Sequence, residues 1–189
     1  MTLHLLWQTL FWIWIASEVL LVLATRTRRR SGEVRDRGSL LILWPTIFIS
    51  IYAASWYGSS HAHTMLGGAH WLLWLAVALL FAGFLLRWTA ILLLGRSFSV
   101  NVAIHATQTL YRRGLYRLIR HPSYTGALVC LAAVGIGTRN WLALAIVFIP
   151  TTAAFLYRIH VEEAALLHAF GPDYAQYTQT TKRLIPGVY

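Results

Sequence analysis

Charge and cysteine are both scarce in this chain of 189 residues. Only 12% of the residues are charged, six are acidic, and the single cysteine, Cys130, stands inside an apolar run. One cysteine excludes an intrachain disulfide, and its apolar surroundings favour an inert core thiol. No serine–histidine–acid set, cysteine–histidine pair or phosphate-cradling glycine loop is recognisable, so hydrolysis and phosphoryl transfer are poor interpretations.

Hydrophobic residues dominate instead, at 58% of the chain. That fraction is too high for a soluble domain of this size, and the nine tryptophans are typical of helix ends at a lipid–water interface. The formal net charge of +10 does not indicate nucleic acid, because the basic residues cluster beside apolar runs. They favour topology signals and contacts to anionic lipid headgroups. The sequence therefore predicts an all-α, polytopic membrane protein.

About five transmembrane helices are predicted, at Leu3–Ala24, Leu40–Tyr57, Trp71–Leu94, Tyr124–Gly137 and Trp141–His160. The first is long enough to span a bilayer and lacks the basic n-region of a cleavable signal peptide. The last two form a tight antiparallel hairpin turned at residues 135–140. Small residues in the short fourth helix predict close helix contact.

Basic residues predict the orientation. Residues 26–37 carry six arginines and belong in the cytoplasm, whereas residues 58–70 have no lysine or arginine and belong on the opposite side. The N-terminus is then outside and the C-terminus cytoplasmic. The mixed segment 97–120 is long for a simple connection, which favours a functional cytoplasmic loop. Residues 162–181 are expected to form a cytoplasmic helix against the membrane face.

A few polar side chains stand in or beside the apolar runs. For Glu18 a hydrogen-bonded interior acid is favoured over a direct site role, and the long stem of Arg87 is expected to let it snorkel to the interface. His61, His63 and His70 offer only an H-x-H spacing without a nearby acid or cysteine. Solvated loop histidines are therefore favoured over a metal site.

The corner at residues 120–126 is the most informative stretch. Pro122 suits the first turn of a helix with His121 as its cap, and the free N–H groups of that turn could hold an anion. A plain helix start at a membrane surface explains the pattern equally well. The hairpin should return Arg158 to the same membrane face as His121.

Arg158 and Glu162 are four residues apart and share a helix face. They form either a simple surface ion pair or a ligand site. An arginine fork suits a carboxylate or phosphate, and a glutamate suits an amine, hydroxyl or sulfonium group. Tyr111, Tyr116 and Tyr124 offer flat faces for a purine ring or a cation.

At these residues a resemblance becomes specific. The motifs are LGRSFS at 94–99, GLYRLIRHPSYTG at 114–126, Arg158 with Glu162-Glu163, FGPDYAQY at 170–177, and Arg183 with Pro186. Over roughly residue 92 to the end, the chain resembles the isoprenylcysteine carboxyl methyltransferase family of membrane methyltransferases. The first two spans carry no matching motif.

The resemblance implies methyl transfer from S-adenosylmethionine to the carboxylate of an isoprenylated cysteine or similar lipidic acid. Residues 1–94 would form three N-terminal helices and residues 95–189 the catalytic region, within one membrane domain. Arg158 would hold the substrate carboxylate. The implied cofactor residues are Asn101, Gln108, Thr109, Leu110, Tyr111, Tyr116, His121, Pro122, Ser123, Tyr124 and Glu162. Family members commonly have a histidine where Gln108 stands.

Two other interpretations stay open. The chain could methylate the amine of a phospholipid headgroup, or it could be a non-catalytic membrane module whose arginines bind anionic lipid. Either way the expected partners are lipids, with no nucleic acid and no metal. The expected membrane is the bacterial inner membrane or the endoplasmic reticulum, depending on the source.

Overall fold

The fold is known from a computed structural model that describes residues 2–26, 33–34, 38–61, 70–95, 98, 103–104 and 109–189. Its helices are α1 (Leu3–Arg26), α2 (Ser39–Ser60), α3 (His70–Leu94), α4 (Pro122–Gly137), α5 (Trp141–Phe170) and α6 (Pro172–Thr180), with a 3₁₀ turn, η3, at Gly114–Arg117. Two-residue strands β1 (Glu33–Val34) and β2 (Ala103–Ile104) pair antiparallel. The all-helical prediction is confirmed, with this short pairing as an addition that the sequence did not predict.

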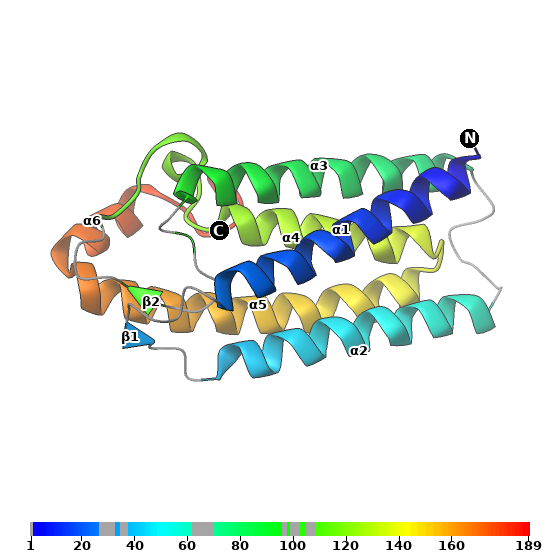
Figure 1. The fold of residues 1–189 in the computed structure, drawn as a ribbon, viewed down its shortest axis with the longest axis horizontal. Coiled ribbons are helices and arrows are strands. Elements are labelled where there is room, and N and C mark those ends of the chain that lie inside the picture. Colours follow the sequence, from blue (N-terminus) through cyan, green and yellow to red (C-terminus); the bar gives the residue numbers. More distant parts are fainter. Residues whose placement is uncertain are drawn as a thin grey trace.

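The long helices form an elongated bundle (Figure 1). Within the described residues, four of them, α1, α2, α3 and α5, are long and apolar enough to cross a bilayer. The fourth predicted span, α4, is shorter, with 16 residues. Helix α3 packs along α4 and α1, while α2 packs along α5. The protein is therefore an integral membrane protein, as predicted.

Helices α3 and α4 approach each other closely at two glycines. A Cβ on Gly126 would lie 2.6 Å from the backbone nitrogen of Arg87 and 2.7 Å from the carbonyl oxygen of Gly83. No side chain larger than hydrogen fits there without moving a helix backbone. The close contact expected from small residues in α4 is confirmed.

The α4–α5 hairpin has the predicted turn. Asn140 caps α5, because its side-chain oxygen accepts hydrogen bonds from the backbone nitrogens of Leu142 and Ala143 at 2.9 and 3.2 Å. Arg139, just before it, adopts a positive φ of 56°. The chain thus reverses within three residues, and the far end of α5 returns to the start of α4 (Figure 1).

The last predicted boundary was wrong. Helix α5 does not end near His160; it continues to Phe170, so Glu162 and Glu163 stand on the same helix as Arg158. No helix-breaking residue intervenes before Gly171-Pro172, where a glycine with φ of 50° ends α5 and a proline opens α6. The expected cytoplasmic helix is the end of α5 followed by α6.

Candidate active site

A cavity of about 850 Å³ lies between helices α1 to α5. Its lining contains both apolar and polar side chains. Apolar side chains of α1 and α2, among them Trp14, Val19, Trp44 and Ile51, line most of it. The polar lining residues are Glu18, Arg87, Tyr116, Arg120, His121, Ser123, Tyr124, Arg158 and Glu162.

His121 and Pro122 form the predicted helix start, with His121 as the cap of α4 and Pro122 in its first turn. The buried imidazole stacks parallel to the ring of Tyr124, with centroids 5.4 Å apart. Its Nε2 lies 3.3 Å from Oε1 of Glu163, and its Nδ1 lies 3.9 Å from Oε2 of Glu162. The hairpin therefore brings the two polar clusters together, as the sequence predicted.

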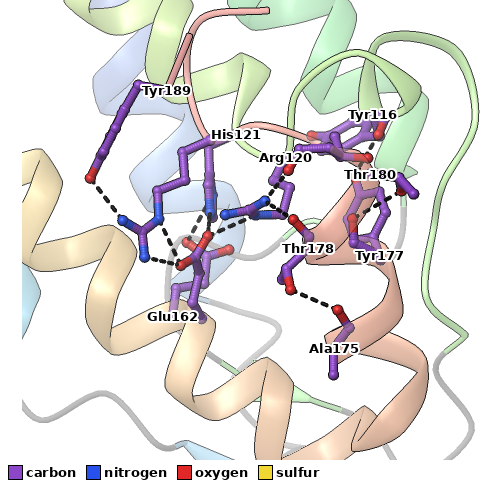
Figure 2. A network of polar contacts seen from close by, with 12 residues as sticks. Tyr116, Arg120, His121, Glu162, Ala175, Tyr177, Thr178, Thr180 and Tyr189 are labelled. Atoms are coloured by element: carbon purple, nitrogen blue, oxygen red, sulfur yellow. Dashed lines mark hydrogen bonds and ion pairs between the residues drawn. The ribbon is translucent and has the colours of Figure 1, made fainter. Parts of the chain in front are cut away.

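Glu163 is the centre of an ion-pair cluster at this corner. Figure 2 shows the corner, with Arg120, His121 and Glu162 labelled. One of its oxygens accepts from Nε of Arg120 at 2.8 Å, and the other lies 2.8 Å from Nη2 of Arg183. Arg183 also donates to the hydroxyl of Tyr189 at 2.9 Å. This carboxylate consequently joins α5 to His121 and to the C-terminal tail.

The C-terminal tail is fixed to the same corner through its backbone. The nitrogens of Arg120 and His121 donate to the carbonyl oxygens of Lys182 and Arg183 at 2.8 and 3.0 Å. Arg120 also donates to the carbonyl oxygen of Thr181. The tail thereby orients the first turn of α4.

Arg158 is 1% exposed and lies in the cavity wall. Its Nε lies 3.4 Å from the hydroxyl of Tyr124, which donates at 2.6 Å to Glu162. Its Nη1 donates at 2.5 Å to the hydroxyl of Ser39, the first residue of α2. The structure thus places a tyrosine hydroxyl between two residues expected to be direct neighbours.

The hydroxyl groups of Tyr116 and Tyr177 form hydrogen bonds to backbone carbonyl oxygens close to this corner. The hydroxyl of Tyr116 donates to the carbonyl oxygen of Ala90 at 3.2 Å, and that of Tyr177 donates to the carbonyl oxygen of Tyr116. Burial raises the pKa of Tyr177 to about 12, and burial followed by the charge of Glu162 raises the pKa of Tyr116. Both hydroxyls therefore stay neutral at physiological pH. Tyr111 packs edge-on against Tyr116 at 5.6 Å.

Arg87 does not snorkel, contrary to the prediction. Its side chain is buried, with 7% of the residue exposed, and it forms an ion pair with Glu18 of α1. The buried acid offers the guanidinium a better partner than a distant interface does. The prediction that Glu18 is a hydrogen-bonded interior acid is confirmed.

The predicted site residues divide into three groups. Those lining the cavity are Tyr116, His121, Ser123, Tyr124, Arg158 and Glu162. Those described elsewhere in the structure are Thr109, Leu110, Tyr111 and Pro122. Asn101 and Gln108, together with His63, lie outside the described residues.

Sequence reasoning missed the partners that hold the site: Ser39, Arg120, Glu163 and Arg183. The available signal was the scarcity of acids. Two adjacent glutamates in a chain with six acidic and sixteen basic residues are candidates for buried arginine partners.

The sequence profile of the isoprenylcysteine carboxyl methyltransferase family matches residues 74–168, half of the chain. The chain belongs to the isoprenylcysteine carboxyl methyltransferase family. The matched stretch runs from within α3 to near the end of α5 and includes His121, Tyr124, Arg158 and both glutamates, so the family core contains most of the polar lining of the cavity.

Individual proteins show a similar likeness to this chain. Protein-S-isoprenylcysteine O-methyltransferase B of Arabidopsis thaliana is 31% identical over 124 residues, which cover 63% of this chain and 62% of the plant protein. Methanethiol S-methyltransferase 1 of Bradyrhizobium diazoefficiens is 39% identical over 72 residues, covering 38% of this chain and 24% of that protein.

A solved structure, that of a eukaryotic intramembrane Ras methyltransferase of the family, superimposes with a TM-score of 0.67 at 28% identity. It covers 77% of this chain and 53% of the solved chain. The matched part of the chain therefore spans 24% to 62% of the length of these proteins. Membership of a methyltransferase family implies a methyl donor.

Proposed function

We propose that this protein transfers a methyl group from S-adenosylmethionine to the carboxylate of an isoprenylated cysteine or a similar lipidic acid. The observation that carries the proposal is the placing of Arg158, a buried guanidinium in the wall of a cavity that is polar at one end and apolar along α1 and α2. A molecule with an anionic head and a long apolar tail matches this division.

Arg158 binds and orients the acceptor carboxylate. A guanidinium can engage both oxygens of a carboxylate at once, and Tyr124 and Ser39 hold this one in place. The carboxylate is already ionised at neutral pH, so no general base is required. Rate then comes from alignment and from removal of water around the nucleophile.

The polar end of the cavity fits the proposed cofactor. S-adenosylmethionine would supply an electrophilic methyl group on a positively charged sulfur. The carboxylate of Glu162, with 27% of its side chain exposed, can accept from an ammonium or hydroxyl group and offset positive charge. Tyr116, His121 and Tyr124 add aromatic faces beside it. The proposed roles of Thr109, Leu110, Tyr111, Pro122 and Ser123 rest on the family resemblance.

The acceptor tail enters between α1 and α2. Both helices line the cavity, but α1 packs mainly on α3 and α2 mainly on α5. A lateral opening between two helices that have separate packing partners admits a chain from the lipid. The proposed membrane partners are therefore the lipidic acceptor and the surrounding lipids.

We place the polar end of the bundle in the cytoplasm and the N-terminus on the other side. The η3 turn, α6 and the tail lie at that end, where Arg112, Arg113, Arg117 and Lys182 are exposed, which favours a cytoplasmic position. A water-soluble donor can then reach the site from the cytosol. The membrane would be a bacterial inner membrane or the endoplasmic reticulum.

The test is a methylation assay with the purified protein, labelled S-adenosylmethionine and two acceptors. We expect transfer to a farnesylated cysteine derivative but not to phosphatidylethanolamine. A base-labile methyl ester is the expected product. Transfer to phosphatidylethanolamine alone would establish an amine methyltransferase, and absence of saturable cofactor binding would leave a non-catalytic lipid-binding module.

A further inference from the structure

The ion pair between Glu18 and Arg87 stands in the same cavity as the proposed acceptor site. Glu18 is 8% exposed and Arg87 is 7% exposed, and both line the cavity from helices that cross the membrane. Nε and Nη2 of Arg87 each engage one oxygen of Glu18, the second at 2.6 Å. This two-pronged contact is the way in which an arginine binds any carboxylate.

Three arginines line the cavity, and one of them, Arg120, is paired with Glu163. The other two, Arg87 and Arg158, both contact residues in the first turn of α4. Arg87 donates through Nη1 to the hydroxyl and carbonyl oxygens of Ser123, at 3.0 and 3.2 Å. Arg158 contacts the next residue, Tyr124, and through it lies beside Glu162. A lipidic carboxylate that enters this space meets both arginines, but only Arg158 stands on the side of Glu162.

The Glu18–Arg87 ion pair is not needed merely to hold α1 against α3, because other contacts join these two helices. Trp88 of α3 also donates to Ser17 of α1 at 3.3 Å, and Trp14 of α1 is part of the hydrophobic core. Ionised groups at membrane depth are costly, and a buried pair is often no more stabilising than apolar residues of the same size. The pair therefore calls for a function beyond packing.

We infer that Glu18 masks Arg87, as a built-in carboxylate that prevents lipidic acids from binding there in a non-productive position. The acceptor is thereby directed to Arg158. The inference rests on the proposed function for the identity of the acceptor, whereas the masking concerns any lipidic carboxylate.

Kinetics of Glu18→Gln test the inference, with the farnesylated cysteine derivative as acceptor. An unmasked Arg87 would bind the acceptor non-productively, so kcat and KM should fall together by about tenfold while kcat/KM stays within about twofold. The double variant Glu18→Gln with Arg87→Met lacks the unmasked guanidinium of Arg87 and should recover the original kcat and KM. A fall in kcat/KM of Glu18→Gln with unchanged KM, or a double variant as impaired as the single one, would overturn the inference.

A binding measurement separates this inference from the proposed function. In Glu18→Ala, decanoate should refill the vacated place and raise the unfolding temperature in detergent more than decanol does. The double variant Glu18→Ala with Arg87→Met should show no such difference. This outcome does not depend on methyl transfer, so an inactive wild-type protein would count against the proposed function alone.

Folding of the single variant is itself informative, because Glu18→Ala leaves a buried charge unpaired. If folded protein is recovered only when decanoate is present, the carboxylate is replacing Glu18, which supports masking. Equal behaviour in decanoate and decanol, whether folded or unfolded, would refute it.

Discussion

At the scale of single residues, the two neighbouring glutamates of α5 have different surroundings. Glu163 is enclosed by Arg120, His121 and Arg183, with 12% of its side chain exposed. Glu162 is more exposed, lines the cavity and accepts a hydrogen bond from Tyr124. One therefore holds the corner together, and the other is available to a ligand.

Replacing Arg158 and Glu162 separately should divide acceptor binding from cofactor binding. Arg158→Ala is expected to lower methyl transfer by roughly 100-fold or more, because the carboxylate loses its charged partner, while the cofactor Kd stays nearly unchanged. Glu162→Ala should weaken cofactor binding instead. Calorimetric titration with S-adenosylmethionine, alongside the transfer assay, measures both effects.

Arg139→Ala is the matched control for Arg158→Ala, because this arginine lies in the hairpin turn at the opposite end of α5. Its activity should equal that of the wild type. Loss of cofactor binding in Arg158→Ala would move that arginine to the cofactor site.

The variant Glu163→Gln tests whether Glu163 has the structural role described above. Two arginines lose a buried anionic partner, so the free energy of unfolding should fall by about 3 kcal/mol. Asp173→Asn removes an exposed acid 4.0 Å from Arg112 and should cost little. Thermal unfolding in detergent compares them, and equal stability of the two variants would contradict the role given to Glu163.

At the scale of the helices, α4 is held by a close approach on one side and by the C-terminal tail on the other. Gly83 and Gly126 bring α3 and α4 together, and Thr125 donates to the carbonyl oxygen of Leu184 at 2.8 Å. Because His121 and Tyr124 belong to the start of α4, any shift of this helix moves the site.

Gly126→Ala should therefore destabilise the protein by about 2 kcal/mol or more, since its Cβ would meet the helix backbone of α3. Gly137→Ala, on the same helix, is the control. Its Cβ would meet only the ring of Trp7, a side chain that can shift. Unfolding temperatures that fall equally for both variants would show that the α3–α4 approach is not tight.

At the scale of the whole molecule, five helices from both halves of the chain enclose one cavity. The family profile begins at residue 74, so the walls from α1 and α2 lie outside the matched core. The core thus provides most of the polar lining, and in the proposed function the first two helices would contact the acceptor tail.

A bulky residue deep in α2 should consequently change the preferred tail length. Ile51 lines the cavity, twelve positions after the start of α2 at Ser39. Ile51→Trp should raise KM for a farnesylated acceptor about tenfold and leave a geranylated one nearly unchanged. Ile49→Trp, on the exposed face with 67% exposure, should alter neither. Equal effects on both acceptors would contradict this position of the tail.

The sequence alone determined the membrane helices, the start of α4 at Pro122, the hairpin turn and the return of Arg158 to His121. These follow from local properties: apolar length, the fixed φ of proline, and the reversal of a chain between two spans. Motif spacing also indicated the family.

Only the tertiary structure decided which charges meet. Glu18 and Arg87 are 69 positions apart, and Arg158 and Ser39 are 119 apart. No periodicity relates such residues, because their pairing depends on which helices pack together and at what height. The same packing placed Tyr124 between Arg158 and Glu162, and it turned two adjacent glutamates toward different partners.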